Sequence, residues 1–470
     1  MDTRLDSTFE SSGGFWLPEE STKIHGRLRY DPTKGLELEL VQNPTNSPAV
    51  LQANGQQLAT MFGNLVDGTL VTLAGLLFKN TSIGLGIGST TTLHVEQALF
   101  GHHVADLNQL LLKRFSVELS SLSDWAGISP VNFKLTETEG KPNGFDLTCR
   151  RPSPICVTMP NRPFDIEINY AMKTQQTNCS FSVTWSAAIT VIAHDSLSFT
   201  QIQEIAWQCQ NLMSLLIGER LSIRMVTIVA VEAAEPFAAE RVLKMVYEQV
   251  GNHDQKDVHS SRMLLPYDIV NEEFPAMVEN WFGRSEQMVL ATNIFFGSQS
   301  IQSLAVNVKF LEAAQAVESY HRSLGTGLYM GQAEFDAAIQ ELSTHLPDAI
   351  EGDHRHSLKN RLKYGNEYSL RKRLAEMFNR LPEAVRQRIA GDVSRFIAKV
   401  VDTRNYYTHY DHAAQANAFD GGDAYIAAER LSVLVVANLL HDLGVKDESL
   451  LRILERHHRF QHWMSQALTF

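Results

Sequence analysis

Hydrophobic and polar residues alternate with a period of two in several segments of the first 300 residues. Residues 36–40 and 181–185 are the clearest cases, because every second side chain in each segment is apolar. Successive side chains of a β-strand point to opposite faces, so this pattern predicts strands with one face in the core and the other in water. Further strands are predicted at residues 70–78, 115–119, 189–193 and 223–231.

Two predicted helices interrupt this β-rich part of the chain. Residues 200–217 carry apolar side chains at helical spacing and precede Gly218, a residue type that commonly ends helices. Residues 272–282 form the second predicted helix.

After about residue 300 the apolar positions recur every three or four residues, which is typical of amphipathic helices. Helices are predicted at residues 303–324, 334–345, 358–381, 390–407, 423–443 and 447–467. For the third of these, a break at Gly365 is an open alternative. The fold class is therefore α+β. A β-rich N-terminal module of one or two subdomains is predicted at residues 1–295, and an all-α helical bundle at residues 300–470.

Composition indicates an ordinary globular protein. The 470 residues are 44% hydrophobic and 20% charged, which suffices for a sizeable core. The sequence starts without an apolar leader and has no apolar run as long as a membrane span, so we expect a cytoplasmic protein with no membrane contact. The net charge of −12 argues against a protein that coats nucleic acids without specificity.

One tract of the predicted bundle is positively charged, although the net charge of the whole chain is negative. Residues 353–399 contain twelve Lys and Arg against five Asp and Glu, a local balance of +7. This tract is either a solvated basic face or a rim that faces RNA. Its densest part is Arg371, Lys372 and Arg373, and Arg395 lies further along it.

The most informative residue is Arg404, in the predicted helix that follows this tract. Phe396, Ile397 and Val400 form an apolar stripe, and Arg404 falls within it at about 100° per residue. A guanidinium in an apolar stripe is costly unless it is paired or lines a cleft. The alternative is that the helix ends earlier or that the side chain reaches water.

His409 follows Arg404 by five residues, which would separate the two side chains by about 140° on one helix. Either the helix ends between them, near Tyr407, or each side chain meets others across a dimer axis. An arginine suits a phosphate and a histidine moves protons near neutral pH. Together they match the cleavage of RNA by its own 2′-OH, which needs no metal.

Glu318 and the nearby tyrosines are further candidates. Glu318 lies inside the apolar arc of the helix predicted at residues 303–324, so a cation should neutralise it, and Arg404 is the obvious one. Alternatively, Glu318 sits at the edge of the arc and reaches solvent. Tyr406, Tyr407 and Tyr410 offer stacking surfaces for bases, although we expect two of the three to pack within the bundle.

A different chemistry is offered by His441 and Asp442 together with His457 and His458, residue types that a metal-dependent phosphohydrolase would use. Gly444 follows closely, however, so the first pair lies in the last turn of a helix, where a polar cap is common. We therefore expect no metal and no other cofactor, and keep this activity as the less favoured alternative.

The spacing of Arg404, Asn405 and His409 resembles the R-x4-6-H motif of HEPN domains, in which a polar residue often follows the arginine. Residues 300–470 are similar to the Apea-like HEPN domain. The segments at residues 15–18, 26–28 and 35–38 resemble the N-terminal domain that precedes it in ApeA proteins.

This resemblance implies a metal-independent endoribonuclease toxin of an abortive-infection system directed against phage. It implies a homodimer in which two copies of the catalytic residues Arg404 and His409 share one cleft, with Asn405 orienting the motif. RNA would be the substrate, contacted by the basic rim and Tyr410, and a phage-derived trigger would act on the N-terminal module. The alternative within the family is a HEPN module that binds RNA without cutting it.

Overall fold

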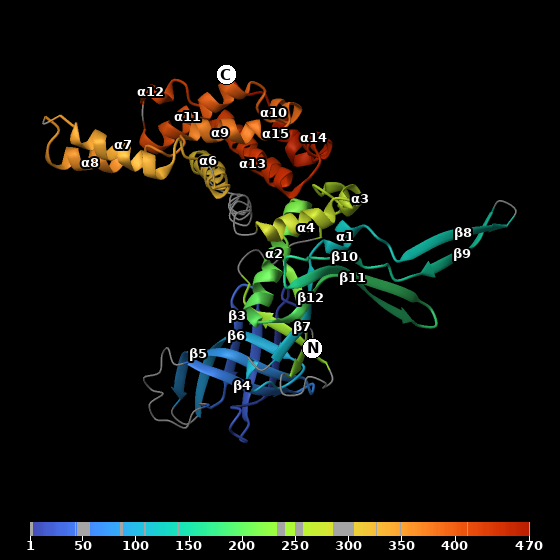
Figure 1. Cartoon of the computed structure of the whole chain (residues 1–470). Coiled ribbons are helices and arrows are strands. Elements are labelled where there is room, and N and C mark those ends of the chain that lie inside the picture. Colours follow the sequence, from blue (N-terminus) through green and yellow to red (C-terminus); the bar gives the residue numbers. More distant parts are fainter. Residues whose placement is uncertain are drawn as a thin grey trace. The chain divides into compact units, whose positions relative to one another are not determined.

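The computed structural model divides the chain into two compact units, Met1–Pro275 and Ala276–Phe470. It describes residues 3–42, 44, 57–84, 88–107, 110–138, 141–232, 240–249, 257–284, 305–325, 327–347, 349–410 and 412–469. The predicted boundary at residues 295–300 lies outside the described residues. Figure 1 shows the β-rich N-terminal unit and the helical C-terminal unit, which is the predicted α+β class.

The N-terminal unit is built on a twelve-stranded antiparallel sheet. Six of its strands close into a ring because the last of them, β5, pairs again with β6. In spatial order the ring contains β6 (Gly88–Phe100), β3 (Gly35–Leu40), β2 (Ile24–Asp31), β1 (Phe9–Trp16), β4 (Gln57–Leu65) and β5 (Leu70–Gly84). The predicted strands at residues 36–40 and 70–78 belong to this ring.

The remaining strands of the sheet continue outward from β6. They are β14 (Arg241–Tyr247), β13 (Ile223–Glu232), β7 (Leu110–Leu119), β12 (Phe181–Leu197), β11 (Phe164–Gln176) and β10 (Ile155–Val157). Helix α2 (Phe199–Ile217) contacts β7 and β12. It begins with a capping box formed by Ser198 and Gln201 and ends at Gly218, whose φ of 86° is readily adopted by glycine. The prediction of this helix is confirmed.

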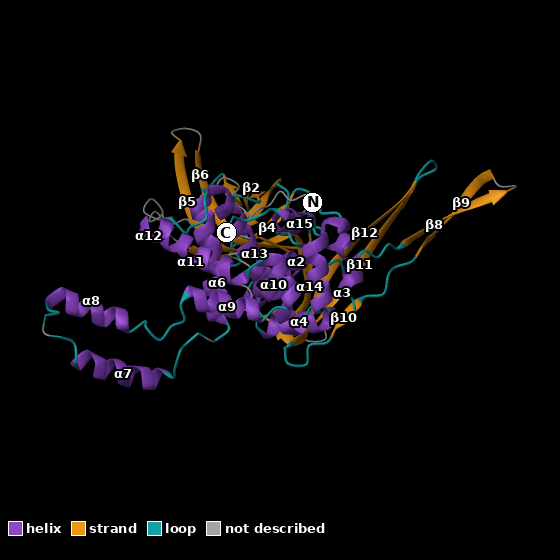
Figure 2. Cartoon of the chain, turned by 90° about the horizontal axis from the view of Figure 1, so that it is seen from above, coloured by secondary structure: helices purple, strands orange, loops and turns teal. Residues whose placement is uncertain are grey.

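Two hairpins of the N-terminal unit carry exposed side chains. Strands β8 (Val131–Thr138) and β9 (Lys141–Cys149) form a separate two-stranded sheet, and Figure 2 shows this ribbon apart from the larger sheet. The second hairpin is the turn end of β11 and β12. Short helices α1 (Leu122–Ala126) and α3 (Tyr267–Val270), the 3₁₀ turn Ser260–Arg262 and helix α4 (Phe274–Gly283) follow elsewhere in the chain.

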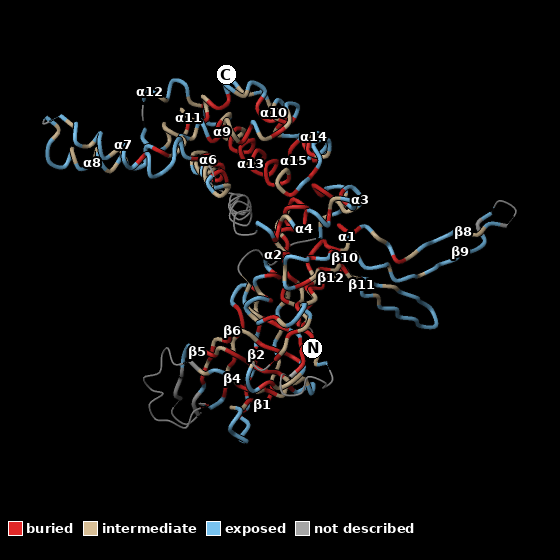
Figure 3. Tube along the Cα trace, viewed as in Figure 1, coloured by how far each residue is buried: buried red, intermediate tan, exposed pale blue. Residues whose placement is uncertain are grey.

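The prediction that residues 181–185 place one face in the core is wrong. Phe181 is 51% exposed and Trp185 is 38% exposed. The strand itself is present, but β12 pairs with β7 only over Ile189–Leu197, so its first residues extend beyond the shared sheet with β11 alone. Figure 3 shows this end of the hairpin as exposed.

The C-terminal unit is a helical bundle around α13 (Gly421–Leu443). Helix α6 (Val306–Ser323) packs along α13, and α9 (Leu370–Asn379) and α11 (Val393–His409) pack against α6. The surrounding helices are α10 (Glu383–Ala390), α12 (His412–Gln415), α14 (Asp447–Arg456) and α15 (His458–Ser465). By length and composition α13 is apolar enough to span a membrane, but 78% of its most apolar window is buried inside the protein, as in a core helix.

Helices α7 (Gln332–Thr344) and α8 (Gly352–Leu362) form an arm that leaves the bundle. The arm is closed at its base by a β-bridge between Leu328 and Glu367. Only Phe335 of α7 is buried, and no residue of α8 is. The helix predicted at residues 358–381 is interrupted around Gly365, where the sequence offered a break, because α8 ends at Leu362 and α9 begins at Leu370.

Candidate functional site

Arg404 lies on α11 at a position that faces α6. The Arg404 Nη2 atom is 3.8 Å from Glu318 Oε1, and the two side chains are 36% and 23% exposed. The buried stripe of α11 consists of Phe396, Ile397, Val400 and Thr403, so Arg404 sits at the edge of the stripe rather than within the core. The structure thus brings Arg404 and Glu318 together at the bundle surface.

A pocket of about 380 Å³ surrounds this ion pair. Residues of α6 and α11 line it, namely Leu311, Ala314, Gln315, Glu318, Ser319, Arg322, Arg404 and Thr408. Sequence reasoning missed Arg322, although its spacing of four residues from Glu318 places it on the same helix face. Arg322 Nη2 also contacts Glu367 Oε2 at 2.6 Å, so the pocket is bordered by the base of the arm.

Asn405 and Thr408 support the arginine from its own helix. Arg404 Nη1 donates a long hydrogen bond of 3.5 Å to Asn405 Oδ1. Thr408 Oγ1 donates to the backbone carbonyl of Arg404 at 2.7 Å. Asn405 therefore contacts the guanidinium directly, which fits an orienting role.

His409 is not in the pocket that Arg404 lines. The predicted helix end near Tyr407 is wrong, because α11 continues through His409 and ends at Tyr410, whose φ is 51°. The Tyr410 N–H still donates to the Tyr406 carbonyl at 2.7 Å, so helical hydrogen bonding persists across the motif. The angular separation of about 140° between Arg404 and His409 is therefore kept, and His409 is exposed on another side of the helix.

The three tyrosines of this helix differ in their surroundings. Tyr407 packs edge-on against Phe310 with ring centroids 5.8 Å apart, and burial raises the pKa of its hydroxyl. Tyr406 lies between Tyr407 and Tyr410, with centroid distances of 5.5 and 6.2 Å. Tyr410 is 70% exposed, which leaves its ring accessible for stacking.

The basic rim separates into exposed and buried residues. Arg371, Lys372 and Arg395 are exposed. Lys372 and Arg395 form surface ion pairs within one helical turn, and the Lys372 ammonium also lies 5.3 Å from the centroid of the Tyr368 ring. Arg373 is 2% exposed and donates to Tyr368 O at 3.0 Å and Glu367 Oε2 at 3.3 Å.

The Arg373 guanidinium also contacts His321 Nδ1 at 3.1 Å, and burial lowers the pKa of both side chains. Since all of these contacts lie inside the bundle, Arg373 is committed to the fold. We therefore leave it out of the set of residues that would contact RNA.

Helix α8 carries further cations of the basic tract at residues 353–399. Lys359 and Arg361 of α8, and Lys363 after it, are exposed and form no ion pair in the described part of the chain. Arg355 differs, since it donates to the Leu346 and Ile350 carbonyls and closes the turn before α8.

The residues of the alternative metal site serve the fold in this structure. Asp442 is 6% exposed and accepts hydrogen bonds from Tyr320 and Arg380. His441 lies in the last turn of α13, and His457 separates α14 from α15. Within the described ranges, no three His, Cys, Asp or Glu side chains are grouped so that they could hold a metal ion.

Two family models match the chain in sequence order. Residues 10–281 match the model described as ApeA N-terminal domain 1, and residues 311–449 match the model described as Apea-like HEPN. The second match includes Glu318, Arg404 and His409. No curated protein and no solved structure matches the chain significantly.

Replacing Arg373 should destabilise the bundle far more than replacing its neighbour Arg371. Arg373→Ala removes a buried guanidinium that bonds the Tyr368 carbonyl and His321, and it leaves a cavity, which we expect to cost about 3 kcal/mol of unfolding free energy. Arg371→Ala, on the exposed face, should change that free energy by less than about 0.5 kcal/mol. Urea unfolding followed by circular dichroism measures both, and equal effects would contradict the structural role of Arg373.

Proposed function

We propose that this chain, which belongs to the family that joins an ApeA N-terminal domain to an Apea-like HEPN domain, is a metal-independent endoribonuclease. HEPN domains are generally ribonucleases, and the family supports a role in defence. The observation that supports the proposal best is the Arg404–Glu318 pair in an open pocket of the HEPN domain, one helical turn from His409.

The proposed reaction uses the RNA as its own nucleophile. The 2′-OH attacks the adjacent phosphorus, and the bond from phosphorus to the 5′-oxygen of the next nucleotide breaks. His409 moves protons for this exchange, and the Arg404 guanidinium binds the phosphorane as its negative charge grows. The products are a 2′,3′-cyclic phosphate and a 5′-hydroxyl. Glu318 holds Arg404 in place through their ion pair, and Asn405 orients the guanidinium.

A homodimer brings the two catalytic groups to one site in this proposal. Because α11 is helical through His409, one chain presents Arg404 and His409 to different sides. A two-fold axis near α11 would place the imidazole of one copy beside the guanidinium of the other, and two-fold dimers are the most frequent oligomers. The shared cleft would then contain two copies of each residue.

The RNA would lie along exposed cations of the helical unit. We assign Arg371, Lys372, Arg395 and the exposed ring of Tyr410 to RNA contacts, with Lys359, Arg361 and Lys363 of the arm region. Phosphate contacts make binding dependent on salt, and an exposed aromatic ring stacks on bases without strong sequence preference.

The second candidate function is a HEPN module that binds RNA without cutting it. The observation in its favour is that His409 lies outside the pocket that Arg404 lines, so a monomer lacks a composite site. The metal-dependent phosphohydrolase is less favoured, because Asp442 is already paired with Tyr320 and Arg380.

The biological setting that we propose is abortive infection in the cytoplasm, and the family supports the role in defence. In this setting the N-terminal unit would respond to a phage-derived trigger, and RNA cleavage by the HEPN domain would stop the growth of the infected cell. The domain order, with an ApeA N-terminal domain ahead of the HEPN domain, supports this division of labour.

Single substitutions at either catalytic residue should abolish cleavage, and mixing the two variants should restore part of it. Arg404→Ala and His409→Ala should each lower the rate at least about 100-fold, measured with end-labelled RNA. His412→Ala, which changes an exposed histidine nearby, serves as the control. If the two variants are unfolded together and refolded as a mixture, about half of the dimers carry one intact Arg404 and one intact His409. No recovery in that mixture would contradict the shared cleft.

Two experiments test the reaction mechanism: chelation of metal ions and replacement of the 2′-OH in the substrate. Cleavage should continue in excess EDTA and should leave a 2′,3′-cyclic phosphate, which mass spectrometry of the fragments identifies. RNA with a single 2′-deoxy nucleotide at the cleaved position should resist cleavage there, because its nucleophile is missing. Cutting of the deoxy strand, or loss of activity on chelation that zinc or manganese restores, would favour the phosphohydrolase alternative.

Glu318 should influence the site only through Arg404. Glu318→Gln keeps the shape but removes the charge that holds the guanidinium, so we expect a fall in kcat of about tenfold with little change in stability. Glu312→Gln, on the same helix, should leave the rate unchanged because Glu312 does not line the pocket. Equal and negligible effects would support a solvent-facing role for Glu318.

A further inference from the structure

Arg322 is a cation that the proposed reaction does not use, although it lines the α6–α11 pocket, the pocket of about 380 Å³ that also contains Glu318 and Arg404. It follows Glu318 by one helical turn, so both side chains lie on the same face of α6. Arg322 Nη2 is 2.6 Å from Glu367 Oε2, and the arginine side chain is 55% exposed. The guanidinium therefore lies where the pocket meets the base of the arm.

Glu367 is shared by two arginines. Its Oε2 atom is also 3.3 Å from Nη2 of Arg373, a buried residue that the Tyr368 carbonyl and His321 hold in place. If Arg322 turned away, Glu367 would still have a cation beside it. An exposed ion pair contributes little to stability, so the release of Arg322 from Glu367 costs little.

Positive charge is in excess around this pair. The ion pairs join three guanidiniums and two carboxylates, namely Arg322, Arg373, Arg404, Glu318 and Glu367. Burial lowers the pKa of Arg373, and repulsion from Arg322 lowers it further. Glu376 also acts on Arg373, but it has a cation of its own in Lys372, at 3.5 Å. An anion that entered the pocket next to Arg322 would balance the excess.

The neutral polar side chains of the pocket suit an anion with several oxygens. Gln315 and Ser319 line the pocket from α6, and their side chains form no hydrogen bond within the described residues. An amide and a hydroxyl both donate hydrogen bonds to phosphate oxygens. A guanidinium binds two such oxygens at once through its planar fork. A phosphodiester group therefore finds suitable partners beside Arg322.

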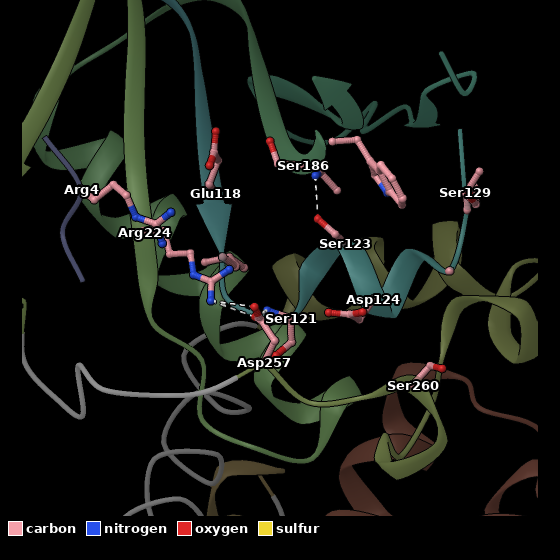
Figure 4. Close-up of a pocket in the computed structure, with 15 residues that line it drawn as sticks. Arg4, Glu118, Ser121, Ser123, Asp124, Ser129, Ser186, Arg224, Asp257 and Ser260 are labelled. Atoms are coloured by element: carbon pink, nitrogen blue, oxygen red, sulfur yellow. Dashed lines mark hydrogen bonds and ion pairs between the residues drawn. The ribbon is translucent and has the colours of Figure 1, made fainter. Parts of the chain in front are cut away.

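A pocket of about 560 Å³ in the N-terminal unit has the opposite charge balance. Its lining includes two arginines and three carboxylates, namely Arg4, Arg224, Glu118, Asp124 and Asp257. Figure 4 shows Arg224 facing Asp257, at a distance of 2.9 Å, and Arg224 also contacts Asp6 at 3.2 Å. Carboxylates outnumber cations there, so an excess of cations distinguishes the α6–α11 pocket from this one.

The position of Arg322 along α6 indicates which phosphate it would reach. Four residues of helix span roughly 6 Å, so Arg322 lies that far along α6 from Glu318, the residue that holds Arg404. A phosphate bound by Arg404 therefore leaves Arg322 free for the next phosphate of the same strand.

We propose that Arg322 binds a second phosphate group of the RNA strand, next to the phosphate that Arg404 binds. The inference rests on the proposed function and adds a contact to it. In the free protein, Glu367 holds the guanidinium at the edge of the pocket. When a strand enters, Arg322 moves from the carboxylate to the phosphate, while Arg373 stays beside Glu367. Arg322 thus binds and positions the strand and takes no part in the proton transfers.

The test measures how the full-length protein binds a strand that lacks the 2′-OH. The probe is a fluorescein-labelled strand of twelve deoxyuridines, and fluorescence polarisation gives its affinity at several salt concentrations. Arg322→Gln should weaken binding about tenfold at low salt. It should also reduce the slope of log K against log[salt] by about 0.7, the contribution of one phosphate contact on a single strand.

Arg452→Gln is the matched control, because it removes an exposed arginine from α14, a helix that packs against α10, α13 and α15. This variant should bind the strand as the wild type does. Circular dichroism and the thermal midpoint confirm that each variant is folded.

The exchange of partners predicts a second effect of opposite sign. Glu367→Gln removes the carboxylate that competes for Arg322, so it should tighten binding about threefold. In the Arg322→Gln background the same change should have no effect, because the guanidinium that it releases is missing.

Cleavage kinetics separate this inference from the proposed function. Arg322→Gln should raise KM about tenfold with little change in kcat, whereas loss of Arg404 should lower kcat. A protein that cuts no RNA would contradict the proposed function, and the binding measurement would still decide the role of Arg322.

Two results would overturn the inference. One is a salt slope that Arg322→Gln changes no more than Arg452→Gln does. The other is an effect of Glu367→Gln that persists in the Arg322→Gln background, which would assign the Arg322–Glu367 pair to the fold of the arm base alone.

Discussion

The attachment of α6 to the buried helix α13 is the constraint on which the candidate catalytic site depends. Near the start of α6, Lys309 Nζ contacts the buried Glu429 of α13 at 2.5 Å. Near its end, the Tyr320 hydroxyl donates to the buried Asp442 of α13. A buried carboxylate without such a partner would be costly, so both contacts hold the helices in register. Because α6 is fixed at both ends, Glu318 is held where it meets Arg404.

The sequence predicted much of this arrangement because the determining signals are local. The helix of residues 200–217 follows from a periodic apolar stripe and a terminal glycine, and both are properties of a short segment. The proximity of Glu318 and Arg404 also follows from local rules, because helical periodicity places each of them on the inward side of its own helix. Two such charges of opposite sign in one small bundle are expected to meet.

The predictions that failed depend on what lies next to an element. Alternation at residues 181–185 shows which side chains share a face, but only the length of the neighbouring strands decides whether that face is covered. The tract from Arg371 to Arg373 has uniform charge in sequence, yet helix geometry turns Arg373 inward to His321 while Arg371 stays outside. Likewise, α11 ends at the left-handed conformation of Tyr410. No local sequence signal predicted this conformation.

The β-bridge at the base of the arm has a thermodynamic consequence for the helical unit. The bridge between Leu328 and Glu367, with the hydrogen bond from Tyr368 N–H to the Gly327 carbonyl, joins the chain where it leaves the bundle and where it returns. Because the bridge holds the two ends of the arm together, the entropy cost of loop closure for this segment does not fall on the bundle. With only Phe335 buried, α7 and α8 form a separate cooperative unit whose amides can exchange with solvent by local opening, while the bundle beneath stays folded.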